Sequence, residues 1–526
     1  MGHFMSIMSI MSTYRAGWLA VLVWILVSIC TPVLAQDDLV QQRWMRLDSS
    51  HFTVLSQAPE RQTQRFLRDL ESWRQIAAYQ IVGRSVLPAI PIPNYVYLFD
   101  SKDDFTAFLV GEELGYFYAT PRANFMGILL RDDQSLLQAK HHYAHFLIRN
   151  FADLRLPRWY EEGLASYLAG VNIDDGRGEL ARPSADGYSA LAQVSDTIPM
   201  GRLLYRDDAL ASPRLIQFAN LKSEALFHYL RHGYEEDAFP DRRAQLARYV
   251  ELLLEGRSAR FAFDQSFDIT TAELDAEYVD YLSNSRRPRV NVEHGELAPV
   301  QVSVAAPLDA GRVAILLGEL GLNSGRLDTA QQLFASLVEA EASVARAYSG
   351  LGDALRFDLD EVSDQTIAAY FERAAALAPE DLNIILDLGE YWESELSDCE
   401  KTYSAARRQS LFAVMQEQFT RAYQMAPDNP EVNLAMAQFY LFPEQDWHLG
   451  VSYQEKAFAG LPADSFIMEQ ATKYAIAANQ FDYAEQLISE MAQPLHFYGE
   501  PEYVSDLRIR LLKKRRNEPY DACADY

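Results

Sequence analysis

The chain has 526 residues and carries 74 acidic against 47 basic side chains, which gives a formal charge of −27. Such an acidic surface argues against nucleic acid as a partner, because phosphate binding needs a basic face. It also argues against adhesion to an anionic membrane. With 49% apolar residues the chain can bury sizeable cores, and its length predicts about two to four domains.

The first 35 residues have the layout of a secretory signal peptide. One charged residue, Arg15, precedes an apolar run over residues 18–30 and the small-residue ending Val33-Leu34-Ala35. The run is shorter than the roughly 20 residues that span a bilayer. We therefore expect export across the inner membrane, a periplasmic location and no integral membrane segment after cleavage. An uncleaved N-terminal anchor is the alternative.

Residues 36–282 mix short strands with helices, which predicts an α+β domain. Strand-like alternation and β-forming residues occur over residues 51–56 and 94–100, and residues 124–130 are expected to form a further strand. Apolar residues at helical spacing predict helices over residues 60–82, 136–151 and 160–170.

Residues 283–310 have three prolines and no helical period, which predicts a linker that could hold a short hairpin. A helical and repetitive segment follows over residues 311–494, and residues 495–526 are expected to form a C-terminal tail. Two cysteines, Cys399 and Cys523, remain after removal of the signal peptide. They could pair in an oxidising compartment, but the sequence does not decide this.

The helical segment repeats a Leu-Gly pair on one helix and a Phe and an Ala on the next. The copies are Leu317-Gly318 with Ala330 and Phe334, Leu351-Gly352 with Phe371 and Ala374, and Leu388-Gly389 with Phe419 and Ala422. Two weaker copies follow, around Ala457 and over residues 480–491. The pattern resembles tetratricopeptide repeats, in which small residues let paired helices approach closely. This implies an all-α solenoid, with an irregular helical bundle as the alternative.

Two histidines, His141 and His145, lie four residues apart on a predicted helix and therefore on the same helix face. Two such imidazoles and one carboxylate form a three-ligand zinc site with an open position for water. Chance alone gives roughly 0.19 pairs of this spacing in a chain with 10 histidines, so the pair by itself is weak support.

The carboxylate Glu162, on the next predicted helix, strengthens the case. The segments KHHYAHFLIRN and LPRWYEEGLASYLAG resemble the zinc-binding core of bacterial peptidase-MA-like gluzincin domains, and the likeness extends over residues 42–282. Such domains are often followed by tetratricopeptide repeats. The resemblance implies an α+β zincin-like metallopeptidase fold in which His141, His145 and Glu162 bind one zinc ion.

The resemblance also implies that residues 124–130 form the edge strand along which an extended peptide lies, with Asn124, Met126 and Gly127 in contact with it. One departure from the family pattern concerns the general base. HExxH places a glutamate directly after the first histidine, whereas this chain has His142 there. Losing a general base typically costs about 10²–10⁴-fold in rate.

Other side chains near the motif have simpler interpretations. Glu161 points about 100° away from Glu162 on a helix and is expected to be a solvated carboxylate. The same offset argues against His142 as a third imidazole ligand. The second pair, His228 and His232, has no accompanying carboxylate motif and is interpreted as structural. Family members often carry a tyrosine near the start of the helix with these two histidines, where it can stabilise an oxyanion. In this chain Asn220 stands there, or the position is unfilled.

These observations favour an exported metallopeptidase-like protein that is catalytically impaired and binds peptide or protein segments through its zinc-site cleft and repeat array. Whether it is an enzyme stays open at this point. One alternative is an active but atypical zinc metallopeptidase, with imidazole or another carboxylate as the base. The other is an N-terminal fold that is purely structural and holds no metal.

Overall fold

The computed structural model describes residues 38–526 except for short stretches, and the predicted signal peptide lies outside the described residues. The stretches that are not described are 110–113, 152–155, 175–176, 182–190, 193–196, 206–211, 285–288, 341–342, 357–361, 493–499, 522 and 524–526. Within the described part of the chain, no helix is both long enough and apolar enough to cross a membrane.

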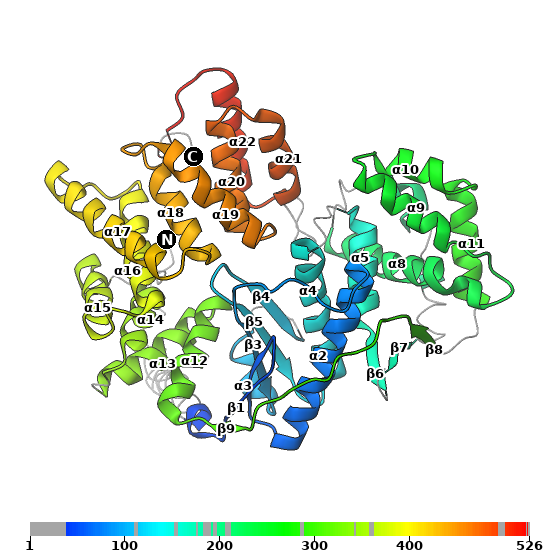
Figure 1. Ribbon diagram of the computed structural model, residues 1–526, viewed down its shortest axis with the longest axis horizontal. Helices are drawn as coiled ribbons and strands as arrows, with labels where there is room; N and C mark the ends of the chain where they lie inside the picture. Colours follow the sequence, from blue (N-terminus) through cyan, green and yellow to red (C-terminus); the bar gives the residue numbers. More distant parts are fainter. Residues whose placement is uncertain are drawn as a thin grey trace, which may run out of the picture.

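A six-stranded sheet forms the centre of the N-terminal region (Figure 1). Its strands are β1 (Met45–Asp48), β2 (Thr53–Ser56), β3 (Asn94–Phe99), β4 (Tyr116–Ala119), β5 (Asn124–Leu129) and β9 (Ala306–Pro307). The spatial order is β4-β5-β3-β2-β1-β9. Strands β2, β3 and β5 are parallel, whereas β4 runs antiparallel along β5 at one edge.

Two long helices cover one face of this sheet, α2 (Glu60–Val82) and α4 (Asp133–Phe151). Val54, Val96 and Met126 from the strands pack there against Trp73 of α2 and Tyr143 of α4. Helix α4 begins where Asp132 accepts hydrogen bonds from the backbone amides of the first turn, which is a usual way to start a helix. The α+β character predicted for the N-terminal region is confirmed.

The opposite face of the sheet is covered partly by the repeats themselves. Besides the short helix α3 (Lys102–Thr106), it contacts α12 (Ala310–Asn323) and α13 (Leu327–Glu339), the first helical pair of the repeat segment. Tyr97 of β3 is fully buried there, and its hydroxyl donates to the carbonyl of Leu316 at 2.9 Å. The first repeat therefore belongs to the same core as the sheet.

The segment predicted as a linker contributes strands to two different sheets, so the predicted hairpin is wrong. Strand β8 (Arg289–Val292) pairs with β7 (Arg177–Ala181), which pairs with β6 (Val171–Asp174). Strand β9 instead pairs with β1. Between them the chain runs along α2, where Gln75 and Gln80 hydrogen-bond to the backbone of Ala298 and Glu293.

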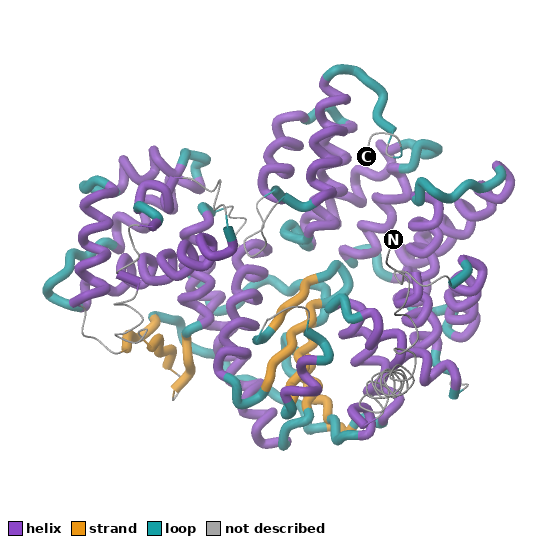
Figure 2. Tube along the Cα trace, turned by 180° about the vertical axis from the view of Figure 1, so that it is seen from behind, coloured by secondary structure: helices purple, strands orange, loops and turns teal. Residues whose placement is uncertain are grey.

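A helical lobe packs beside α5 (Arg158–Ala169), and Figure 2 shows it next to the smaller group of strands. It contains α7 (Met200–Tyr205), α8 (Pro213–His232), α9 (Arg243–Leu254), α10 (Ala259–Ser266) and α11 (Thr271–Asn284). Gly163 of α5 lets α8 approach closely, since a Cβ there would lie 2.7 Å from the carbonyl oxygen of Ser223. This close contact holds α5 in place next to α4.

The repeat segment folds into successive helical pairs, which confirms helical repeats. After α12 and α13 come α14 (Ala345–Arg356), α15 (Asp364–Leu377), α16 (Leu382–Ser397), α17 (Ala405–Met425), α18 (Pro430–Leu441), α19 (Val451–Gly460), α20 (Ser465–Ala477) and α21 (Phe481–Met491). The predicted glycines meet the predicted aromatic rings. A Cβ at Gly389 would lie 2.4 Å from the ring of Phe419, and one at Gly352 would lie 2.8 Å from that of Phe371.

The C-terminal segment is more than a tail, because it contains α22 (Glu502–Arg515). Val504, Leu507 and Leu511 of this helix are buried against α20 and α21. Beyond it, Cys523 forms a disulfide bond with Cys399, and their Cα atoms are 5.3 Å apart. The end of the chain is thereby tied to the turn after α16.

The repeats curve around the β4 edge of the sheet from α12 to α21 (Figure 1). Arg122, in the turn between β4 and β5, reaches into the array and forms ion pairs with Asp387 of α16 at 2.6 Å and Glu431 of α18 at 2.7 Å. Arg346 of α14 shares Asp387 at 2.6 Å. At the far end, Asn150 of α4 accepts a hydrogen bond from the backbone of Ala463. The array thus contacts the N-terminal region at several points.

Candidate metal centre

Helix α4 carries both histidines of the predicted metal site. It packs on the sheet through residues such as Tyr143 and Leu147, so His141 and His145 lie on its other side, towards α5. Helix α5 supplies Glu162, whose side chain is fully buried. The close packing of α5 between α4 and α8 therefore brings the three predicted ligands together.

The potential ligand atoms of His141, His145 and Glu162 all lie within 4.8 Å of one another. The two Nε2 atoms are 3.2 Å apart. The Glu162 Oε2 atom is 3.5 Å from the His141 Nε2 and 3.8 Å from the His145 Nε2. Among the described residues, no other group of three histidine, cysteine or acidic side chains converges in this way.

These separations match what a zinc ion needs. Zinc binds histidine nitrogen and carboxylate oxygen at about 2.0–2.2 Å in a tetrahedron, which places neighbouring ligand atoms about 3.3 Å apart. The observed separations of 3.2, 3.5 and 3.8 Å are close to that value. The residues present fit one zinc ion, held by the two Nε2 atoms and the Glu162 carboxylate.

The outward-facing nitrogens of both rings also have partners. The Nδ1 of His145 is 2.9 Å from the Glu161 carboxylate, which also accepts from Arg149 at 2.6 Å. The Nδ1 of His141 is 3.3 Å from the Ser166 hydroxyl. Metal-binding histidines usually bond through their second nitrogen to a carboxylate or another polar group, which fixes the orientation of the ring.

Glu161 is therefore not the solvated carboxylate expected from the sequence. It does point away from the position between the three ligands, as the helical offset requires. The packing of α4 against α5 nevertheless buries it, leaving it 3% exposed, because His145 and Arg149 of α4 face it. Arg149 is four residues after His145, and that spacing could have placed both on one helix face.

Burial and neighbouring charges shift the pKa values of this cluster in opposite directions. Burial raises the pKa of Glu161, but Arg149 and His145 outweigh it and hold the pKa below its usual value. Burial lowers the pKa of His145, yet hydrogen bonds to Glu161 and Glu162 raise it overall. For His141, burial prevails over Glu162 and the pKa is lowered.

His142 occupies the position of the missing glutamate. Burial, followed by the neighbouring rings of His141 and His145, lowers its pKa to about 3, so the ring is neutral near physiological pH. Its ring centroid is 5.7 Å from that of His141. It is outside the converging group of ligand atoms, and its neutral ring supplies no fixed negative charge beside that group.

The predicted edge strand is internal, which corrects the expectation for Asn124, Met126 and Gly127. Strand β5 pairs with β3 on one side and with β4 on the other, so β4 is the edge. Asn124 donates to Asn94 of β3 at 2.8 Å. Gly127 is covered by Tyr116 of β4, whose ring a Cβ would meet at 2.0 Å. These residues hold the sheet together and cannot pair with an added peptide strand.

The second histidine pair lies on α8, in the helical lobe and apart from the candidate metal centre. His228 is 2.7 Å from the Tyr281 hydroxyl, and His232 bonds to the Tyr167 hydroxyl at 2.9 Å and to Glu235 at 2.7 Å. These contacts agree with the structural interpretation. Asn220 is on α8, outside the converging ligand group, and no catalytic role for it follows.

No protein-family model matches this chain, and a comparison with curated proteins found no similar one. Among solved structures, the chain has some likeness to a thermophilic tetratricopeptide-repeat protein of Thermus thermophilus. The two are 16% identical, with a TM-score of 0.31, and the match covers 39% of this chain and 99% of that one. The zincin-like character of the N-terminal region stays a prediction.

Proposed function

We propose that this is a zinc-binding protein with a metallopeptidase-like centre that lacks its general base, and that it acts by binding peptide or protein segments. The observation that carries the proposal is the converging set of His141, His145 and Glu162, with separations that suit zinc. The bonds from the histidine Nδ1 atoms to Glu161 and Ser166 support it, since a metal site needs oriented rings.

The residues of the centre would have different roles: some would bind zinc, others would orient a ligand, and no carboxylate stands at the position of the general base. Zinc bound there would polarise a carbonyl group or lower the pKa of a bound water. His141, His145 and Glu162 would hold it, and Glu161 and Arg149 would orient His145. A hydrolytic centre also needs a group that takes a proton from water, and position 142 supplies a ring in place of a carboxylate.

Strand β4 offers the surface that the sequence assigned to β5. It is the sheet edge next to α4, and among the described strands it pairs with β5 alone. An extended segment could add to its other side through backbone hydrogen bonds. The helical repeats that curve around this edge agree with a role in binding protein segments.

A second candidate is an active atypical zinc metallopeptidase. The complete ligand set and its outer hydrogen bonds support this candidate as well, because an active zinc metallopeptidase needs the same ligands. Export to the periplasm is part of both proposals. The Cys399–Cys523 disulfide supports it, since such bonds persist in oxidising compartments.

The first test is the zinc content of the purified protein lacking residues 1–35. We expect about one zinc ion per chain, lost in His145→Ala and retained in His448→Ala, a control at an exposed histidine. No zinc after loading would contradict the proposal and leave a purely structural fold.

The second test compares hydrolysis of unfolded proteins and peptides by the wild type and by His142→Glu. We expect an inert wild type and hydrolysis in the variant, because the substitution restores a carboxylate base. If the wild type already cleaves and His145→Ala abolishes cleavage, the active-enzyme candidate is correct instead.

A further inference from the structure

The side of α12, α14, α16 and α18 that is turned towards the sheet, here called the inner face, has more acidic than basic groups. Ion pairs among the described residues connect Arg122 with two arginines and five carboxylates of the array: Arg346, Arg356, Glu319, Asp353, Asp387, Glu390 and Glu431. Carboxylates in such a poorly hydrated place are costly unless cations balance them. The arginines of the array are too few for this, so the inner face favours a further cation.

Arg122, in the turn between β4 and β5, supplies that cation. Its Nη1 donates to Asp387 at 2.6 Å, its Nε donates to Glu431 at 2.7 Å, and its Nη2 lies 3.6 Å from Glu390. The two acceptors stand on neighbouring helices, α16 and α18. The donors of a guanidinium group have a fixed forked arrangement, whereas a lysine ammonium acts as a point charge. The inner face therefore suits an arginine that comes from outside the array.

Arg122 does not balance the charge of the inner face completely, because it brings the number of arginines only to three against five carboxylates. Burial, and next the charge of Glu431, raise the pKa of Glu390 to about 8, although Arg122 opposes them. Burial also raises the pKa of Glu431. Both carboxylates thus hold a proton more firmly than usual, as expected where positive charge is still lacking.

The site around Arg122 is open to solvent. The Arg122 side chain is 23% exposed, and that of Glu390 is 34% exposed. The turn that carries Arg122 also closes on itself, since the backbone amide of Thr120 donates to the carbonyl of Ala123 at 3.0 Å. The turn can therefore keep its shape when the Arg122 side chain leaves the inner face, and another side chain can take its place.

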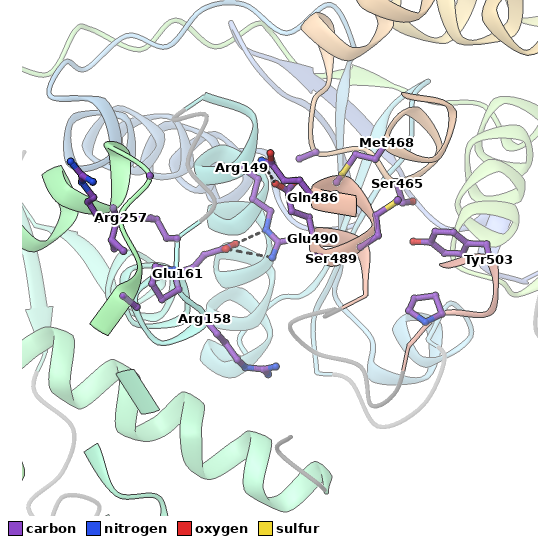
Figure 3. Close-up of a pocket in the computed structure, with 18 residues that line it drawn as sticks. Arg149, Arg158, Glu161, Arg257, Ser465, Met468, Gln486, Ser489, Glu490 and Tyr503 are labelled. Atoms are coloured by element: carbon purple, nitrogen blue, oxygen red, sulfur yellow. Dashed lines mark hydrogen bonds and ion pairs between the residues drawn. The ribbon is translucent and has the colours of Figure 1, made fainter. Parts of the chain in front are cut away.

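A cavity of about 600 Å³ lies close to this site, between the last repeats and the start of α5 (Figure 3). Gly460 at the end of α19 packs against Pro430, the residue before Glu431, and a Cβ there would lie 2.8 Å from the proline ring. Ala463, three residues further along, lines the cavity, with Met468 on the same wall. An extended chain whose arginine lay between α16 and α18 would have room here for its neighbouring residues.

We propose that the inner face is a binding site for an arginine-bearing protein segment, and that the chain closes it with its own Arg122. The β4–β5 turn is then an internal competitor. A partner binds when its arginine replaces Arg122 between Asp387 and Glu431. This inference rests on the proposed function in taking the partner to be a protein segment, and it adds the side chain by which the segment is recognised. It does not depend on zinc.

The test measures peptide binding to the full mature protein by fluorescence polarisation. The probe is a labelled peptide that copies residues 119–124, Ala-Thr-Pro-Arg-Ala-Asn, and its controls carry glutamine or lysine in place of arginine. We expect Arg122→Ala to bind the arginine peptide at least about tenfold more tightly than the glutamine peptide, with the lysine peptide between them. The wild type should bind the arginine peptide at least about tenfold more weakly than Arg122→Ala does, because Arg122 competes.

Two further variants locate the binding. Arg131→Ala removes an exposed arginine just after β5 and should bind the peptide as the wild type does. Adding Glu431→Gln to Arg122→Ala removes one acceptor and should weaken binding about tenfold. If Arg122→Ala is too unstable for titration, its melting temperature with and without peptide gives the same answer. The arginine peptide should raise that temperature, and the glutamine peptide should not.

Equal affinities of Arg122→Ala for the arginine and glutamine peptides would overturn the arginine site. Equal affinities of the wild type and Arg122→Ala would place the peptide elsewhere. No binding by the wild type at about 100 times the dissociation constant of Arg122→Ala would show that the Arg122 contact is permanent. Either result would overturn the internal competition. A protein that binds no zinc fails the zinc part of the proposed function alone, because none of these measurements needs a metal.

Discussion

At the level of single residues, the candidate metal centre depends on contacts behind the ligands as much as on the ligands. The sequence motif identifies His141, His145 and Glu162, and the structure brings their ligand atoms together. The sequence motif does not reveal that Glu161 is buried between His145 and Arg149, because this burial results from how helices α4 and α5 pack. A helical wheel of α5 alone assigns Glu161 to solvent.

Glu161→Gln tests this contact. The amide keeps the shape of the side chain but loses the negative charge that pairs with Arg149 and orients His145. We expect zinc affinity to fall about 10–100-fold, as is typical when a carboxylate behind a histidine ligand is changed. A competition assay with a chelating dye measures it. Glu251→Gln, at an exposed helix position, is the control, and equal affinities in both variants would show that Glu161 is only a packing residue.

At the level of elements, the first three repeats each have a glycine on one helix that faces an aromatic ring on the next. Gly389 of α16 lies against Phe419 of α17, and Gly352 of α14 against Phe371 of α15. The sequence predicted these pairs because the motif places them at fixed positions. The sequence could not predict that β5 lies inside the sheet. The pattern of apolar residues indicates that a strand is buried, but it does not show which strands pair with it.

Gly389→Ala tests the helical pair. The new methyl group would lie 2.4 Å from the ring of Phe419, so the ring or the helix has to shift. We expect a loss of about 1–3 kcal/mol in the free energy of unfolding, measured by urea denaturation. Gly311→Ala in α12 is the control, because its nearest neighbour would be at 3.3 Å and alanine favours a helix.

Adding Phe419→Leu to Gly389→Ala should recover part of the loss, since the smaller side chain leaves room for the methyl group. Additive losses in the double variant would show that the two residues do not act as a pair. Equal stability of Gly389→Ala and the wild type would contradict the close approach of α16 and α17.

At the level of the whole molecule, the N-terminal region and the repeats share cores and ion pairs. The sequence predicted a domain boundary at residue 310, where the proline-containing linker gives way to the helical repeats. In the structure, α12 and α13 cover one face of the sheet, and Arg122 reaches Asp387 and Glu431 in the array. Contacts between residues some 265 positions apart in sequence leave no local pattern, so composition alone could not reveal them.

Arg122→Ala tests the contact between the two parts. The substitution leaves Asp387 and Glu431 buried with one cation fewer, and removal of one partner from a buried ion pair costs about 3–5 kcal/mol. Because the Arg122 side chain is 23% exposed, we expect the lower end of that range in urea denaturation. Arg65→Ala, in an exposed pair, should change stability by less than about 1 kcal/mol. Equal effects would show that the Arg122 contact contributes little.

The placement of α12 and α13 on the sheet has a consequence for the order of folding. Tyr97, Phe99 and Phe125 are buried beneath helices that follow them by more than 180 residues. During synthesis, this face of the sheet stays open until the chain has reached α13. A growing chain of this kind exposes an apolar sheet surface for most of its first 330 residues, and such surfaces are where chaperones bind and aggregation starts.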